Sequence, residues 1–218
     1  MIDHATEGVA GGDRRRTVTL TCPISLAENW LAQRLAGFHE AHPSIEIIVH
    51  GTVWDASTVQ QADLVISMHR HADASSGSVR LFQETLVLLA PPRIAARVQT
   101  TGDLAAERKI VVLGRQDYWS AFEDALGASF DLAVALRTNA TNIALEFAAS
   151  GAGVTPSPIE VAQSYIDRGL LQAVTDQRPL CPWSYYLSEA RPSTHSSVIT
   201  VRDWLLRGED WVHGMSAD

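Results

Sequence analysis

Residues 62–68 form an almost continuous apolar run, ADLVISM, which constrains the fold more than any other segment. A strand that is apolar on both faces is typical of a parallel sheet covered by helices on both sides. Two further strands are predicted before it, at residues 17–22 and 45–50. An amphipathic helix lies between those two strands, with Ser25 as its predicted N-cap. Strand, helix and strand in succession predict an α/β fold with crossover helices.

The alternation of strands and helices continues along the chain. The segment that starts at Val134 repeats the plan of the segment that starts at Val18, with a strand, a polar turn and a helix. This repeat predicts two α/β lobes that bind a ligand at the carboxyl edges of their sheets, where helix N-termini attract anions. Further strands are predicted at 82–90, 110–113, 132–136, 153–158 and 183–188, and further helices at 94–98, 118–126, 141–150, 159–167 and 193–207.

Charge and length exclude several classes of protein. The 218 residues hold 17 Lys and Arg against 25 Asp and Glu, which gives a net charge of −8. This acidic balance argues against a nucleic-acid-binding surface, because such a surface needs clustered basic residues. No apolar run approaches the roughly 20 residues that span a bilayer, and residues 1–16 lack the apolar core of a signal peptide. With two unpaired thiols, Cys22 and Cys181, these features predict a cytoplasmic protein without membrane contact.

The motifs nominate no catalytic residue, metal ligand or cofactor site. The G-x-G at 151–153 follows a helix and precedes a strand, whereas a dinucleotide site needs the reverse order. The histidines of segment 69–71 have no acidic or thiol partner at ligand spacing. Trp54, Tyr118 and Trp119 lie in or beside predicted loops, and two roles stay open for them: surface cover over the sheet edges, or the walls of a ligand cleft.

An ordered set of segments resembles a known family. VTLTCPISLAENWLAQRLAGFHEAHPSIEIIVHG is followed by ADLVIS, ETLVLLAPP, GRQDYW, AASGAGVTPSP and SYYLS. This set is similar to the effector-binding domain of LysR-type transcriptional regulators, nearest the branch that includes regulators of glycine cleavage and of β-lactamase induction. The similarity covers roughly residues 17–208. The matching residues of its first part are Ser25, Trp30-Leu31, Arg34-Leu35, Phe38, His42-Pro43, Ile45 and Asp63-Leu64.

The resemblance implies a periplasmic-binding-protein-like fold of type 2, in which two Rossmann-like α/β lobes are joined by two crossing strands. The first lobe would hold residues 17–85 plus 187–218, and the second lobe residues 86–186. Residues 1–16 would be a flexible linker remnant. A full-length family member begins with a winged helix-turn-helix, so we expect DNA contact only through a helix-turn-helix domain absent from this chain.

The resemblance further implies a small-molecule effector in the cleft between the lobes. Ser25 and Thr141 would donate hydrogen bonds to an anionic group. Arg70 and Arg137 are candidate countercharges, with solvated surface positions as the alternative. The implied ligand contacts are Pro23, Ile24, Ser25, Ser67, Met68, His69, Gln116, Asp117, Tyr118, Trp119, Asn139, Ala140 and Thr141.

We therefore expect an effector-sensing domain rather than an enzyme, in a homodimer, with a tetramer open for the full-length protein. The first helix of one chain would pack against a helix of the second lobe of its two-fold mate. The candidate contacts are Trp30, Arg34 and Phe38 on one side, and Ile143 and Phe147 on the other. Two alternatives stay open: a solute-binding protein of a transporter with the same fold, and an enzyme on this scaffold, for which the sequence shows no acid–base set.

Overall fold

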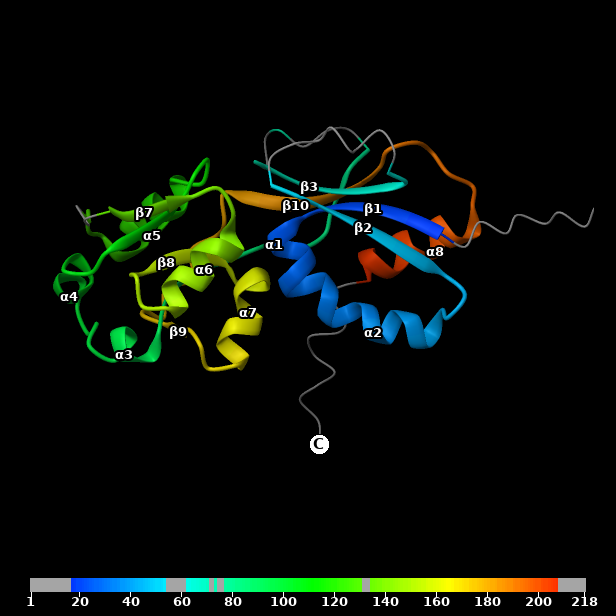
Figure 1. Ribbon diagram of the computed structural model, residues 1–218. Coiled ribbons are helices and arrows are strands. Elements are labelled where there is room, and N and C mark those ends of the chain that lie inside the picture. Colours follow the sequence, from blue (N-terminus) through cyan, green and yellow to red (C-terminus); the bar gives the residue numbers. More distant parts are fainter. Residues whose placement is uncertain (1–16, 54–61, 71–72, 74–76, 131–133, 208–218) are drawn as a thin grey trace, which may run out of the picture.

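The computed structural model describes residues 17–53, 62–70, 73, 77–130 and 134–207, and these form two α/β lobes (Figure 1). The expected linker at 1–16, Trp54 and residues 208–218 lie outside the described part of the chain. Within that part, no helix combines the length and the apolar character needed to cross a membrane.

The first lobe is built on a five-stranded sheet and the helices that cover it. Its strands are β1 (Thr17–Pro23), β2 (Glu46–Thr52), β3 (Leu64–Arg70), β4 (Val79–Arg80) and β10 (Trp183–Glu189), in the order β2-β1-β3-β10-β4. Its helices are α1 (Ile24–Leu26), a π-helical turn (Ala27–Leu31), α2 (Ala32–Ala41) and α8 (Ser196–Leu206). β1 pairs in parallel with β2 and β3, as the strand–helix–strand pattern predicts, and β10 is antiparallel to both its neighbours.

The second lobe contains two smaller sheets. The first is antiparallel in the order β8-β5-β9, from β8 (Thr155–Pro158), β5 (Leu86–Ala90) and β9 (Gln172–Ala173). The second is a parallel pair, β6 (Lys109–Val112) and β7 (Val134–Thr138). The helices are α3 (Pro92–Ala95), α4 (Thr101–Ala105), α5 (Asp117–Leu126), α6 (Thr141–Ala149) and α7 (Ile159–Asp167).

The first helix starts differently from the sequence-based expectation. Its N-cap is Pro23, and helical backbone begins at Ile24 and ends at Ala41. The prediction that Ser25 is the N-cap is wrong, because Ser25 lies inside the first turn, where it is 6% exposed. Its hydroxyl is therefore directed to partners outside its own helix terminus.

One apolar cluster joins the two lobes. Leu20 and Leu64 of the first sheet share it with Leu145 of α6 and Val161 of α7. A second cluster lies within the second lobe and includes Phe122 of α5. Figure 1 shows α1 beside α6 and α7 at the junction, where residues of these helices are in contact. Because burial of an aliphatic side chain stabilises a fold by about 1.5–3 kcal/mol, the shared cluster ties the lobes together.

The two segments that cross between the lobes are also bonded to each other. Thr85 forms a bridge with Leu180. The carbonyl oxygen of Glu84 accepts from the backbone N–H of Cys181 at 3.0 Å, and Glu84 Oε1 accepts from the backbone N–H of Tyr185 at 2.6 Å. Glu84 is 1% exposed, so a buried carboxyl group lies where the two segments cross between the lobes.

Candidate functional site

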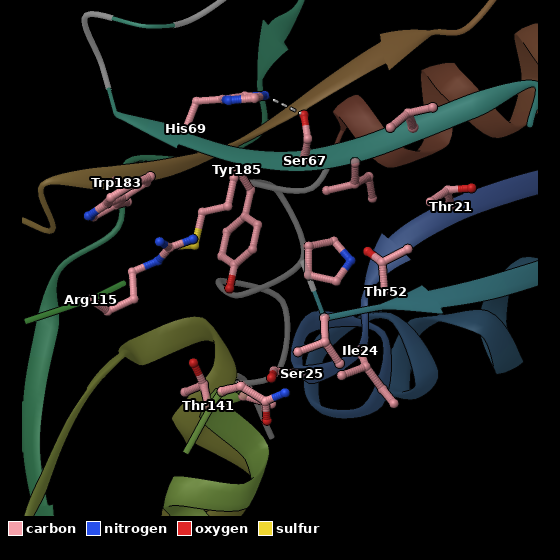
Figure 2. Close-up of a pocket in the computed structure, with 17 residues that line it drawn as sticks. Thr21, Ile24, Ser25, Thr52, Ser67, His69, Arg115, Thr141, Trp183 and Tyr185 are labelled. Carbon is pink, nitrogen blue, oxygen red and sulfur yellow. Dashed lines mark hydrogen bonds between the residues drawn. The ribbon is translucent and has the colours of Figure 1, made fainter. Parts of the chain in front are cut away.

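A cleft of about 360 Å³ lies between the lobes, where β1 and β3 end and where α1 and α6 begin (Figure 2). The strand-to-helix turns of both lobes therefore meet at one place, as the repeated plan predicts. Nine of the implied ligand contacts line this cleft: Pro23, Ile24, Ser25, Ser67, Met68, His69, Asn139, Ala140 and Thr141.

Other lining residues escaped the sequence analysis. Arg115 belongs to the GRQDYW segment, and Trp183 and Tyr185 are alternate residues of the strand WSYYLS. Both segments carry the family resemblance, but these three residues were not among the implied ligand contacts. Figure 2 shows Arg115 and Trp183 on one side of the pocket and Thr21 and Thr52 on the other. The remaining members are Val53, Val65 and Ile66.

Ser25 connects the two lobes at the base of the cleft. Its Oγ accepts a hydrogen bond from the backbone N–H of Asn142 at 3.1 Å and donates to Asn142 Oδ1 at 3.2 Å. Asn142 Nδ2 in turn donates to Glu28 Oε2 at 2.8 Å. The N-cap of α6, Ala140, has no side-chain hydrogen bond. Ser25 thus supplies from the first lobe the hydroxyl that caps a helix of the second lobe.

The π-helical turn adds a second polar contact between the lobes. Asn29 is 4% exposed, and its Nδ2 donates to the carbonyl oxygen of Ser25 at 3.0 Å. Its Oδ1 accepts from Ser164 Oγ of α7 at 2.8 Å. Because a buried amide costs free energy unless it is hydrogen-bonded, this pairing holds the turn in register with α7.

Arg115 provides the positive charge of the cleft wall. Its guanidinium carbon lies 3.7 Å from the ring centroid of Trp183, a cation–π distance, and Nη1 donates to the carbonyl oxygen of Gly114 at 2.9 Å. Among the described residues that line the cleft, none is Asp or Glu and Arg115 is the one side chain with a permanent charge.

Next to this wall, Asp117 binds two partners with one carboxylate oxygen. Oδ2 accepts from Trp183 Nε1 at 2.8 Å and lies 2.7 Å from Nη2 of Arg70. The Arg70 guanidinium also lies 5.0 Å from the Trp183 ring centroid. Arg70 is thus paired beside the cleft rather than on its wall. Arg137, the other candidate countercharge, is exposed on β7 and does not line the cleft.

Ser67 and His69 form a hydrogen-bonded pair on β3. Ser67 Oγ lies 2.8 Å from His69 Nε2, and the His69 ring centroid lies 6.1 Å from that of Tyr186. A hydrogen bond between a serine and a histidine also occurs in nucleophilic arrays, where a third group orients the histidine. Within the described chain no carboxylate binds the other nitrogen of His69, so the third part is not assembled.

The structure places Tyr118 and Trp119 away from the cleft wall, which corrects their predicted role. They begin helix α5 and are 1% and 3% exposed, within the apolar cluster of the second lobe. Trp119 Nε1 donates to the carbonyl oxygen of Ile110 at 3.1 Å. Tyr118 Oη reaches Met68 Sδ, a cleft residue, at 3.8 Å. Both side chains are large and largely apolar, and they pack in the apolar cluster that also contains Val111 of β6.

Two buried side chains that line the cleft, Thr21 and Tyr185, carry hydroxyl groups. Thr21 Oγ1 is buried without a protein partner, and Thr21 is 2% exposed. Tyr185 is also buried, and burial raises the pKa of its hydroxyl well above its ordinary value. Tyr185 therefore stays neutral and can donate a proton in a hydrogen bond. In the described residues no three His, Cys, Asp or Glu side chains are grouped as a metal site requires.

A family model described as the LysR substrate binding domain matches residues 11–208. The chain belongs to this family. The fold is accordingly of the type 2 periplasmic-binding-protein kind, as the resemblance of the segments implies.

Relatives of this LysR-family chain are named as transcriptional activators. The HTH-type transcriptional activator AmpR of Rhodobacter capsulatus is 28% identical over 207 residues, which cover 89% of this chain and 68% of that protein. AmpR of Pseudomonas aeruginosa is 26% identical over 211 residues, which cover 92% of this chain and 68% of that protein.

Solved structures of LysR-family regulators share the fold. The effector domain of AmpR of Pseudomonas aeruginosa superimposes with a TM-score of 0.78 at 21% identity, covering 88% of this chain and 94% of that one. The effector-binding domain of AmpR of Citrobacter freundii gives a TM-score of 0.77 at 18% identity, covering 88% of this chain and 98% of that one.

The residues expected at a dimer interface of this LysR-family domain divide into two groups. Ile143 and Phe147 are exposed on α6, and Trp30 and Arg34 are half-buried, with the Arg34 guanidinium 4.6 Å from the Trp30 ring centroid. Phe38 is 1% exposed, and its ring centroid lies 4.7 Å from that of Trp204. The expectation for Phe38 is corrected: this side chain packs in the core of its own chain.

Proposed function

We propose that this chain is the effector-sensing domain of a LysR-type transcriptional regulator. A small anionic molecule binds in the cleft between the lobes and controls DNA binding and transcription by the full-length protein. It does so because it binds two arrangements of the lobes or subunits with different affinity. The observation that carries the anionic class is Arg115, stacked on Trp183, in a cleft whose described lining includes no carboxylate.

Thr141 and Asn139 complete the binding site in this proposal, together with Ser25, whose hydroxyl proton is donated to Asn142 and would have to be redirected to reach a ligand. They lie where the helices of both lobes begin, so their polar groups add to the partial positive charge of the helix termini. Met68, Ile24 and the Trp183 ring supply apolar surface for the rest of the ligand. A cytoplasmic location follows from this assignment, since an intracellular regulator meets both its effector and its DNA there.

The alternative is a solute-binding protein of a transporter with the same fold. The relatives disfavour it, because they are named as transcriptional activators. An enzyme on this scaffold is disfavoured for the same reason, since the family and the relatives named above are transcriptional regulators.

A thermal-shift screen of the purified chain tests the proposal. The panel consists of carboxylates, sulfonates, amino acids and aromatic acids. A ligand present at about 100 times its Kd adds about 2.7 kcal/mol to the free energy of unfolding, which raises Tm by roughly 5–10 °C in a domain of this size. The shift should vanish in Arg115→Ala and persist in Arg137→Ala, which removes an exposed arginine of the same lobe. Cationic or neutral ligands that bind equally well in both variants would contradict the anionic class.

We also propose that the domain forms a two-fold dimer through α2 and α6, with Trp30, Arg34, Ile143 and Phe147 at the interface. We also propose lobe boundaries near 85/86 and 186/187; the second falls within β10, whose residues from Trp183 onward pair with β3 of the first lobe. Sedimentation tests the interface with a matched pair of variants. Phe147 and Leu170 are 41% and 42% exposed, so Phe147→Asp should yield monomers while Leu170→Asp leaves the assembly unchanged. A dimer that survives Phe147→Asp would place the interface elsewhere.

A further inference from the structure

Two guanidinium groups lie at the Trp183 end of the cleft, and one of them, that of Arg70, is paired with the carboxylate of Asp117. Arg115 lines the cleft, whereas Arg70, which is 51% exposed, is paired with Asp117. Both guanidinium groups are close to the Trp183 ring, at 3.7 Å and 5.0 Å from its centroid. At this end of the cleft, Arg115 is therefore part of the lining, and Arg70 lies next to the lining in an ion pair with Asp117.

We propose that Asp117 determines the charge selectivity of the cleft: by holding Arg70, it favours effectors with one negative charge at this end over effectors with two. This inference rests on the proposed anionic effector and names its charge. Asp117 acts as a positioning residue, because it works through Arg70 and lies outside the cleft lining.

The geometry gives two reasons for this selectivity. A second anionic group on the ligand could recruit Arg70 only by breaking its 2.7 Å contact with Asp117 Oδ2. Asp117 would then be left beside the ligand with Trp183 Nε1 as its partner, while its Oδ1 is already buried without a hydrogen bond. Uncompensated charge is costly in a partly buried site. A single anionic group, in contrast, meets Arg115 and leaves the pair intact.

The contact with Trp183 makes the arrangement rigid. Trp183 Nε1 donates to Asp117 Oδ2 at 2.8 Å, so the carboxylate is fixed to β10 as well as to the first turn of α5. Arg70 lies at the end of β3, so the ion pair also bridges the two lobes. The Asp117→Asn variant keeps an oxygen that accepts from Trp183, and it removes the charge that holds Arg70.

The test compares ligands that differ by one charge and little in shape. The probes are succinate, glutarate and phthalate, each against its monomethyl ester, with Kd measured by calorimetry for the wild type and the variants. In the wild type, the monoester of at least one pair should bind more tightly than the dianion. Asp117→Asn should shift the ratio of the two Kd values toward the dianion by at least tenfold. The matched control is Glu107→Gln, which removes the carboxylate of another ion pair of the second lobe, with Arg97.

The double variant Arg70→Ala/Asp117→Asn distinguishes two reasons why Asp117→Asn could bind the dianion more tightly: the ligand binds the released Arg70, or the ligand is no longer repelled by the charge of Asp117. If Arg70 is the group that Asp117 withholds, the gain for the dianion disappears in the double variant. A gain that survives there overturns the inference, and so does an unchanged ratio in Asp117→Asn. If none of the six probes binds the wild type while a cation or a neutral compound does, the proposed anionic effector fails, and the inference fails with it.

Discussion

Ser25 and Asn142 are 117 positions apart in the sequence, yet the hydroxyl of one accepts a hydrogen bond from the backbone N–H of the other at 3.1 Å. The same hydroxyl donates to the Asn142 side chain. Helix α6 of the second lobe is therefore capped by a residue of the first helix of the chain. An effector bound at the proposed site near Thr141 would lie beside this cap, so we expect its affinity to be coupled to the contact between the lobes.

The Ser25→Ala variant should be less stable than the wild type. Loss of a helix cap costs about 1 kcal/mol, which lowers Tm by roughly 2–4 °C in a domain of this size. Thermal unfolding without ligand measures the change. The matched control is Ser120→Ala, because Ser120 is an exposed serine of α5. Equal Tm values for the two variants would show that the contact with Asn142 does not stabilise the fold.

Thr21→Val should make the protein more stable and weaken its binding of the effector. Thr21 Oγ1 is buried without a protein partner, and an unsatisfied hydroxyl costs about 1–3 kcal/mol. Valine has nearly the same shape and no polar group. Chemical denaturation measures the gain, and ligand titration measures the loss. Thr155→Val is the control, since Thr155 Oγ1 is equally unsatisfied but lies outside the cleft lining, so that variant should gain stability and keep its affinity.

Glu160 should make the stability of the protein depend on pH around neutrality. Burial, with a further contribution from the charge of Glu84, raises the pKa of Glu160 to about 7 from its ordinary value of 4.5. Because the folded state binds this proton more tightly than the unfolded state, the contribution is fully present below pH 4.5 and is lost as the pH rises through 7. The loss amounts to about 3 kcal/mol above pH 7.

The variant Glu160→Gln isolates this contribution, because glutamine stays neutral at every pH. Its free energy of unfolding should match that of the wild type near pH 4.5 and exceed it above pH 7. Denaturant unfolding at several pH values measures the difference, which cancels the titration of the other carboxyl groups. Glu40→Gln, at an exposed position of α2, should show no such divergence. Parallel curves for Glu160→Gln and the wild type would contradict the assignment.

Neither cysteine should react with thiol reagents in the native protein. Cys22 and Cys181 are both 1% exposed or less, and burial raises the pKa of both thiols, that of Cys181 to about 12. Thiolate is the reactive form, so labelling at pH 8 should be negligible until the protein unfolds. Rapid labelling of the folded chain at either position would show that the crossing region or β1 opens to solvent.

The sequence predicted the regular elements better than the directions of side chains. The apolar run that contains β3 correctly predicted a parallel arrangement of β1, β2 and β3. The two strand-to-helix turns correctly predicted that the cleft lies at the carboxyl ends of the strands. Both predictions depend on local sequence patterns. Tyr118 and Trp119 were expected in the cleft and lie in the core, since the packing of α5 on β6 decides which face of a helix is covered. The hydrophobic periodicity of the first turn of α5 does not show which of its faces is buried.

Ser25 illustrates the same limit. A serine at the start of a helix is typical of a cap for that helix, and here it caps a helix of the other lobe. Arg115 was also missed, although it lies in a segment that had been singled out, because its role depends on the Trp183 ring that comes from β10. Contacts between residues so far apart in the chain are a property of the assembled lobes.

The strand order β2-β1-β3-β10-β4 has a consequence for synthesis of the protein on the ribosome. The edge of β3 that faces β10 stays unpaired from the emergence of Arg70 until Trp183 leaves the exit tunnel, and the whole second lobe is made in between. An unpaired apolar strand edge is prone to pair with other chains. The nascent chain therefore carries an unpaired strand edge while the second lobe is synthesised, and the rate of elongation and the binding of chaperones should influence its yield.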